Sequence, residues 1–241
     1  MNGKAIIKFL VVIAAIIGLF AYFIQPLAGS LKQGLDLQGG THIVLEAEDS
    51  ATGQADNDAV ERAKQILERR INEMGLSEPL VQREGARRII IELPGVKDPD
   101  EAIKRIGKTA VLEFKNDQGQ TVMTGDDLKD AKEELGQNKQ PLVAIELSDE
   151  GAKKFADLTS KNIGRRIAIT LDGKELTNPV VQQAITGGKA TISGSQSLEE
   201  AKDLAILLRS GALPVKINVL EVRTVGPSLG QDSKDKSIVA F

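Results

Sequence analysis

Few side chains in this chain of 241 residues are suited to catalysis. Its only histidine, His42, alternates with strand-forming residues, and the chain contains no cysteine. A nucleophilic side chain needs a neighbouring base, and a structural zinc site needs several histidine or cysteine ligands. We therefore expect no catalytic residue and no metal site, and we interpret His42 as an ordinary strand residue.

The motifs that could bind phosphate or calcium are incomplete. Gly187-Gly188-Lys189 resembles the end of a phosphate-binding loop, but Gln183 stands where that motif needs glycine, and Ala190 where it needs serine or threonine. The acids of Asp56-Asn57-Asp58 lack the alternate spacing of a calcium loop and are interpreted as the cap of a helix. We expect no cofactor.

Composition narrows the remaining function classes. The formal net charge is -3, with acidic and basic residues mixed along the chain, which leaves no basic surface for nucleic acid. Aromatic residues make up 3% of the chain, too few for an aromatic-lined small-molecule pocket. These observations favour a binding or mechanical role over an enzyme.

An uncharged apolar stretch from Phe9 to Ile24 indicates a membrane anchor. A spanning helix needs about 17 to 25 residues, a length reached here if the side chain of Lys8 extends to the lipid headgroups. Because Lys4 and Lys8 precede the stretch, we place the N-terminus in the cytoplasm and the rest of the chain on the extracytoplasmic side of the cytoplasmic membrane. A cleavable signal peptide is the alternative, but Pro26-Leu27-Ala28 is a poor cleavage pattern.

A glycine-rich elbow follows the expected anchor. It consists of Gly34, Leu35, Asp36, Leu37, Gln38, Gly39 and Gly40. Glycine tolerates positive φ and a close approach of the backbone, while aspartate often bonds backbone amides in turns. We interpret the elbow as a structural turn between the membrane and the first strand of a domain, with Asp36 as its cap.

Helix and strand signals alternate between His42 and Phe114. The predicted elements are, in order, a strand at 42–46, a helix at 57–74, strands at 79–83 and 88–93, a helix at 99–106 and a strand at 110–114. This β-α-β-β-α-β order is typical of an α+β, ferredoxin-like base, in which two helices cover one face of an antiparallel sheet.

The chain changes character after Lys115. The next predicted elements are a charged helix at 128–135, a strand at 142–147, a helix after Ser148, a hairpin of 166–171 with 175–181, a strand at 190–193, an apolar helix from Leu198 and a strand at 215–219. We predict that residues 116–194 form an inserted α+β head and that the last helix and strand return to the base.

This interpretation divides the chain into four parts. They are an anchor at 1–28, a base at 29–115 and 195–230, a head at 116–194, and the start of a second membrane segment at 231–241. Short polar connections between separate cores favour hinge motion. The predicted hinge residues are Lys115, Asn116, Gly194 and Ser195.

Four motifs in this order resemble the SecD family of the bacterial protein-export translocase. The first is the G-L-D-L-x-G-G pattern of the elbow. The others are Gln183 to Gly194, similar to the end of that family's head; Leu207 to Val215, similar to its return helix and strand; and Val225 to Gly230, similar to its approach to a second membrane helix.

The resemblance implies an accessory subunit of the Sec translocase. It implies SecF as a partner subunit, a SecY-containing channel as the site of action, and a mobile head that touches unfolded polypeptide leaving that channel. In that family the proton motive force drives the movement through membrane helices, so we expect the proton-carrying residues to lie beyond Phe241, in a longer protein.

Two other function classes remain as alternatives. A proton-driven small-molecule exporter of the resistance-nodulation-division type also has ferredoxin-like domains, but it would need an aromatic-lined pocket. A membrane-anchored enzyme is the third hypothesis, disfavoured by the incomplete catalytic motifs.

Overall fold

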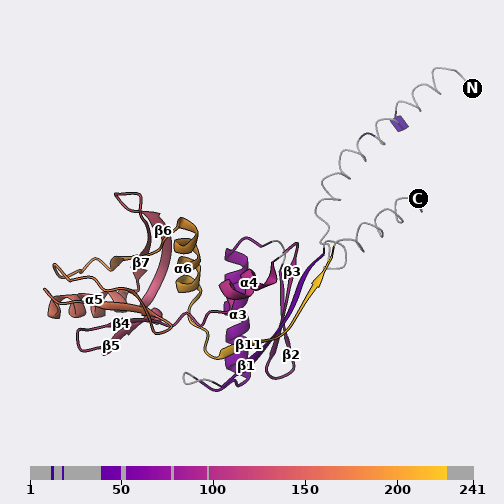
Figure 1. Cartoon of the computed structure of the whole chain (residues 1–241), viewed down its shortest axis with the longest axis horizontal. Coiled ribbons are helices and arrows are strands. Elements are labelled where there is room, and N and C mark those ends of the chain that lie inside the picture. Colours follow the sequence, from indigo (N-terminus) through magenta and orange to yellow (C-terminus); the bar gives the residue numbers. More distant parts are fainter. Residues whose placement is uncertain are drawn as a thin grey trace, which may run out of the picture.

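The computed structural model describes residues 12–13, 18, 39–49, 53–76, 79–96 and 98–226. The predicted anchor, apart from three of its positions, and the elbow residues 34–38 lie outside this range. Within the described residues no helix is both long and apolar enough to cross a membrane. The described part has a mixed α and β structure with three sheets and two hydrophobic cores, one in each of two bodies (Figure 1).

The body around the first core, which we call the base, contains one sheet and two helices. Its elements are β1 (Gly40–Glu48), α3 (Asn57–Glu73), β2 (Leu80–Glu84), β3 (Arg88–Pro94), α4 (Pro99–Ile106) and β11 (Lys216–Val225). The strand order is β11-β1-β3-β2, and each neighbouring pair is antiparallel. Every second residue of β1 is buried, including Ile43 and Leu45, in a core shared with Leu67 and Ile71 of α3.

Capping residues set the starts of both base helices. The side chain of Asp56 accepts a hydrogen bond from the amide of Ala59 at 2.7 Å, and that of Asp98 accepts one from the amide of Glu101 at 3.1 Å. Each bond satisfies a backbone donor that has no partner inside its helix. The predicted helices at 57–74 and 99–106 are confirmed.

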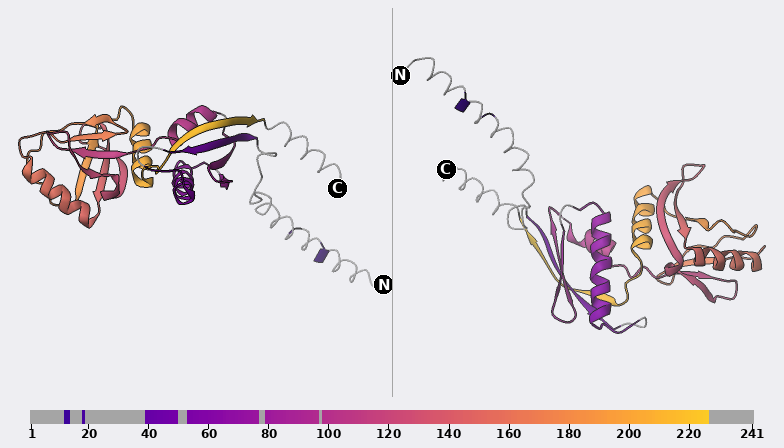
Figure 2. Two further views of the ribbon diagram at one scale, coloured as in Figure 1. Left: turned by 90° about the horizontal axis from the view of Figure 1, so that it is seen from below. Right: turned by 180° about the vertical axis from the view of Figure 1, so that it is seen from behind.

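The body around the second core, which we call the head, contains two sheets. Its elements are β4 (Leu112–Lys115), β5 (Thr121–Thr124), the short 3-10 helix η1 (Gly125–Asp127), β6 (Leu128–Leu135), β7 (Pro141–Leu147), α5 (Asp149–Lys161), β8 (Ala168–Leu171), β9 (Lys174–Thr177), β10 (Lys189–Ser193) and α6 (Leu198–Ser210). The strand orders are β5-β4-β8-β9 and β10-β7-β6. Helix α6 lies between the second sheet and the base (Figures 1 and 2).

The prediction of a charged helix at 128–135 is wrong, because this segment is strand β6. A tight turn, in which the amide of Lys139 donates to the carbonyl of Gly136 at 2.9 Å, brings it back alongside β7. Ala131 is buried in the head core, while most of its neighbours are partly or fully exposed. Pairing with an apolar strand here outweighs the helix propensity of the lysines and glutamates.

Strand β4 and helix α6 also belong to a different body than the sequence suggested. Residues 110–114 were expected to complete the sheet of the base, but β4 pairs with β5 and β8 in the head, and β11 takes the place beside β1. Four buried residues of α6, Ala201, Leu204, Ala205 and Leu208, belong to the head core and none to the base core, while buried Ile206 and Leu207 belong to neither. Apolar faces of this kind fit either core, so their spacing does not decide between them.

Candidate functional site

The two glycines that end the elbow close against the last residues of β3. Gly39 and Gly40 have φ angles of 69° and 149°, and the amide of Gly95 donates to the carbonyl of Gly39 at 3.0 Å. Such backbone angles are strained for residues with a side chain. Gly34, Leu35, Asp36 and Leu37 lie outside the described residues, so the roles predicted for them stay predictions.

The four predicted hinge residues lie within the head. Lys115 is part of β4 and pairs with Ala168, while the amide of Asn116 donates to the carbonyl of Gln120 at 3.0 Å in the β4–β5 turn. Gly194 and Ser195 connect β10 with α6, and both of these elements contribute to the head core. None of the four lies where the chain passes between the two cores.

The chain instead passes between base and head at residues 107–111 and 211–215. These two crossing segments run together, because the amide of Leu213 donates to the carbonyl of Thr109 at 2.8 Å. Each contains a residue with positive φ, Ala110 at 60° and Gly211 at 87°. On the head side, the carboxylate of Asp172 accepts hydrogen bonds from the amides of Ala110 and Val111 at 3.1 and 2.9 Å.

Arg70 of α3 binds both crossing segments from the base side. It is fully buried, and its guanidinium donates to the carbonyls of Ile106 at 2.7 Å, of Gly211 at 2.8 Å and of Lys108, and to the hydroxyl of Ser210 at 3.2 Å. Burial away from water lowers the pKa of Arg70 to about 10, an effect opposed by the charge of Asp172. Arg70 therefore carries its charge at neutral pH.

Arg70 is not among the residues predicted from the sequence, although the sequence contains a signal for it. Position 70 follows Ala63 by seven residues and Leu67 by three, so helical spacing places it on the apolar face of α3. Arginine on such a face requires buried hydrogen-bond acceptors, because an unpaired buried charge is strongly unfavourable. That requirement could have been recognised, but the identity of the acceptors could not.

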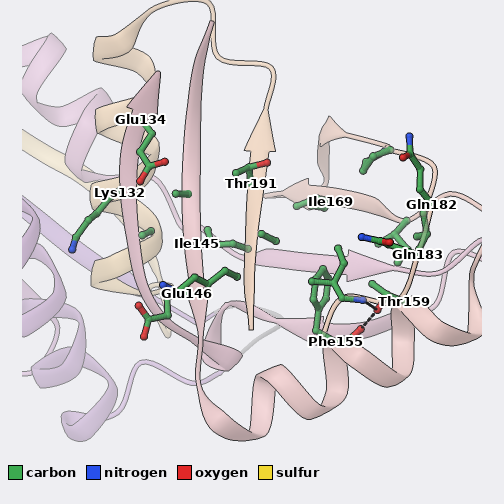
Figure 3. A pocket seen from close by; sticks show the side chains of 18 of the residues that line it. Lys132, Glu134, Ile145, Glu146, Phe155, Thr159, Ile169, Gln182, Gln183 and Thr191 are labelled. Atoms are coloured by element: carbon green, nitrogen blue, oxygen red, sulfur yellow. Dashed lines mark hydrogen bonds between the residues drawn. The ribbon is translucent and has the colours of Figure 1, made fainter. Parts of the chain in front are cut away.

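A cavity of about 730 Å³ opens on the head between the β10-β7-β6 sheet and the segment 179–185 (Figure 3). Apart from Thr159, its buried lining is apolar: Ala131, Ile145, Phe155, Ile167, Ile169 and Val181. Its exposed lining is mostly polar and of mixed charge: Lys132, Glu134, Gln182, Gln183, Lys189 and Thr191, together with the apolar Pro179 and Val180. One wall is fixed by Thr159, whose hydroxyl accepts from the amide of Ile185 at 3.0 Å and donates to the carbonyl of Phe155 at 2.7 Å.

Charged side chains around this cavity form local ion pairs. Glu146, which lines the cavity, bonds to Lys129, and this bond lowers the pKa of Glu146 and raises that of Lys129. Within the described residues no three histidine, aspartate or glutamate side chains converge closely enough to hold a metal ion. The cavity thus offers an apolar floor surrounded by charges that are already paired or of both signs.

Three family models match successive parts of the chain, and the second and third overlap at residues 103–119. The SecD/SecF GG motif matches residues 31–51, the N-terminal model of the P1 domain of protein translocase subunit SecDF matches 60–119, and the SecDF P1 head subdomain matches 103–215. The range of the head model includes β4 and α6, in agreement with the second core.

Known proteins resemble the chain along all or most of its length. Protein translocase subunit SecD of Acidaminococcus fermentans is 58% identical over 241 residues, covering all of this chain and 58% of that protein. SecD of Desulfurispirillum indicum is 33% identical over 358 residues, covering all of this chain and 69% of that protein. SecDF of Thermus thermophilus is 42% identical, covering 86% of this chain and 33% of that one.

Two solved SecDF structures share the fold. A crystal structure of SecDF in a super-membrane-facing form has a TM-score of 0.74 at 41% identity, over 86% of this chain and 33% of that chain. A second, titled as a membrane component that enhances protein export, has a TM-score of 0.69 at 40% identity, over 76% of this chain and 99% of that chain.

These matches define a class, the protein translocase subunits, and within that class the chain belongs to the SecD family. The resemblance inferred from four sequence motifs is confirmed. The chain spans 58% of the Acidaminococcus relative, 52% of the Dictyoglomus turgidum relative and 51% of the Sebaldella termitidis relative.

Proposed function

We propose that this chain is the N-terminal part of an accessory subunit of the Sec protein-export translocase, with a binding and mechanical role. In this proposal a single N-terminal span holds it in the cytoplasmic membrane, and base and head lie on the extracytoplasmic side. The subunit uses the proton motive force to assist the movement of unfolded polypeptide, and the head contacts the emerging chain. Its partners are SecF and the SecY-containing channel.

Membership of the SecD family supports this role, as does the relative described as enhancing protein export. The Thermus relative is named as a SecDF, which supports an association with SecF. A ferredoxin-like base is part of the same proposal. It is supported by the antiparallel order β11-β1-β3-β2, by the β-α-β-β-α sequence of elements, and by β11 as the final strand after the head.

The head cavity is the main observation in support of contact between the head and the exported polypeptide. Exported chains differ in sequence, so a site that binds them must not depend on particular side chains. An apolar floor accepts many hydrophobic segments through burial. The neighbouring strand β10 lies at the edge of its sheet, where main-chain pairing could hold an extended peptide whatever its side chains.

Site-specific photo-crosslinking tests this contact. Val180 lines the cavity and is 46% exposed, whereas Val122 is 42% exposed and lies outside the cavity lining. Each is replaced by cysteine in the intact subunit, labelled with a benzophenone, and illuminated with an export substrate arrested in the channel. We expect several-fold more adduct from Val180→Cys. Equal yields from both positions would contradict substrate binding in the cavity.

A further inference from the structure

Two hydrogen-bonded ion pairs join helix α6 of the head to the base. Arg105 of α4 donates from Nε to Oδ1 of Asp203 at 3.1 Å. Arg209 of α6 donates from Nε and Nη2 to Oε2 of Glu73 in α3 at 2.9 and 2.7 Å. Because α6 shares its core with the head, these two pairs bridge the bodies.

Both ion pairs are accessible to water and salt. The side chains of Arg105 and Asp203 are 26% and 23% exposed, and those of Arg209 and Glu73 are 31% and 23% exposed. Ion pairs in such settings contribute little, since water solvates the separated charges and dissolved salt screens their attraction. They can therefore open without a large penalty.

The hydrogen bonds of Arg70 differ from these ion pairs because they are shielded from water. Its guanidinium is fully buried, and its acceptors lie on both crossing segments, including the carbonyls of Lys108 and Gly211. Separating Arg70 from these acceptors would leave a buried charge and several carbonyls without partners, which is far more costly than opening an accessible pair. Contacts at Arg70 should persist when the ion pairs of α6 open.

The crossing segments have the geometry of a joint beside Arg70. The hydrogen bond between Leu213 and Thr109 ties the two segments, so they must turn together. Ala110 and Gly211 lie outside the helices and strands and have positive φ, and hinges consist of a few loop or element-terminal residues that absorb changes in φ and ψ.

We propose that Arg70 is a positioning residue that serves as the pivot of the head, and that Arg105–Asp203 and Arg209–Glu73 are detachable latches that hold the head in the present orientation. This deepens the proposed function and rests on it, because it specifies how head movement is controlled. Low salt and intact latches keep the head docked, while loss of both latches frees it to turn about Arg70.

The surroundings of the latches determine which residues to replace. Arg105 also lies 3.8 Å from Glu199 and 3.9 Å from Glu101, so replacing Asp203 alone would leave it with other carboxylates. Arg209 also donates to the carbonyl of Ala131 in the head. The informative changes are therefore Arg105→Gln and Glu73→Gln, which remove the bridges and preserve the contacts of Arg209 inside the head.

Distances between spin labels on base and head report the orientation directly. The chain has no native cysteine, so Gln82→Cys in β2 and Lys174→Cys in β9, both exposed, label the two bodies of the full chain. We expect one narrow distance distribution at low salt. In the Arg105→Gln/Glu73→Gln variant the fraction outside that peak should rise at least three-fold, and 1 M NaCl should produce the same rise in the unmodified chain.

The control replaces an ion pair that bridges nothing. Asp157→Asn removes the 2.7 Å pair with Lys161 inside α5, and its distance distribution should match that of the unmodified chain. If neither the double variant nor 1 M NaCl changes the distribution, the latches are refuted.

The pivot is tested separately. Arg70→Lys keeps the charge but loses the planar fork, so the distribution should broaden already at low salt while the circular dichroism spectrum remains unchanged. If this variant does not fold, Ser210→Ala, which removes one acceptor of Arg70, is measured in its place and should broaden the distribution to a smaller extent. A folded variant with the narrow distribution of the unmodified chain would overturn the pivot.

These measurements involve no export substrate, so they test the pivot and the latches independently of the proposed role in export. A head that is released as expected in the double variant, together with an unchanged export rate, would support the latches and show that their opening does not limit export. An unchanged distribution contradicts the latches whatever the export rate.

Discussion

The carbonyl oxygen of Leu93 occupies the space beside Gly40 where a side chain would begin. A Cβ atom on Gly40 would lie 2.5 Å from this oxygen and 2.9 Å from the Cα atom of Pro94. Both obstacles are backbone atoms of the paired strand, so a side-chain rearrangement cannot relieve them. The last glycine of the elbow is thus required where β1 begins beside the end of β3.

Gly40→Ala should lower the free energy of unfolding by about 3 kcal/mol, because the added methyl group forces the strands apart and the φ of 149° is strained. Urea denaturation measures the change. Gly85→Ala is the matched control, since Gly85 also has positive φ but no atom within 4 Å of the added carbon. It should lose only about 1 kcal/mol. Equal losses would show that crowding at Leu93 is unimportant.

Gly39→Val should impair export through the geometry of the elbow. Its φ of 69° is unfavourable for a branched side chain, at a cost of about 1 to 3 kcal/mol. Asp36→Ala should also impair export by removing the predicted cap. A complementation assay measures both. Gly75→Val is the control, because Gly75 has a similar φ of 73° in open surroundings away from the elbow. Normal export with Gly39→Val would argue against a specific role of the elbow. An equal reduction with Gly75→Val would do the same.

Arg70→Met should destabilise the chain by about 3 kcal/mol, because three carbonyls and one hydroxyl lose their buried donor. Thermal or urea unfolding measures the loss. The neighbouring Arg69 is exposed on the same helix, and Arg69→Met should change stability by no more than about 0.5 kcal/mol. Similar losses for the two variants would mean that the buried hydrogen bonds of Arg70 contribute little.

Local signals in the sequence predicted the elements of the base well. A capping side chain marks the start of a helix because it bonds an amide only a few residues away, as Asp56 and Asp98 do. The apolar spacing of α3 likewise predicted its buried face, including Leu67 and Ile71. Such features depend on neighbours within one or two turns, and the sequence contains them directly.

Long-range partners were not predictable in the same way. Residues 128–135 read as a charged helix until their pairing with β7 is known, and β4 has an apolar face that suits either sheet. Buried Arg70 depends on carbonyls 36 to 141 residues away along the chain. For the same reason the hinges were expected at Lys115 and Gly194, where local polarity changes. The segments that connect the two bodies can be located only when the members of the two cores are known, so they were not predicted.

Acid should destabilise the head in part through Glu113. Its carboxylate accepts hydrogen bonds from Lys115 and Thr121 at 2.9 Å each, and the bond from Lys115 is the main cause of its lowered pKa. A lowered folded-state pKa stabilises the fold above the unfolded value of about 4.3, and this contribution is lost as pH falls through the folded value. Glu113→Gln should therefore cost about 1 to 2 kcal/mol at neutral pH and almost nothing near pH 2.

Urea unfolding across this pH range measures the difference between Glu113→Gln and the unmodified chain. Glu68→Gln, at an exposed position of α3, is the control and should show no pH-dependent difference. A cost of Glu113→Gln that is constant between neutral and acidic pH would show that ionisation of Glu113 does not contribute to stability.

A reversible crosslink between base and head should stop export. Arg62 of α3 and Asp126 of η1 line one cleft of about 400 Å³ between the two bodies, which only the two crossing segments connect covalently. In the intact subunit, Arg62→Cys with Asp126→Cys is treated with a bifunctional methanethiosulfonate, and the chain offers no native cysteine to react instead. Because the bridge prevents rotation about the crossing segments, export should fall after crosslinking and recover after reduction.

Each single-cysteine variant receives the same reagent and should export normally. Complete crosslinking at an unchanged export rate would exclude movement between base and head from the mechanism.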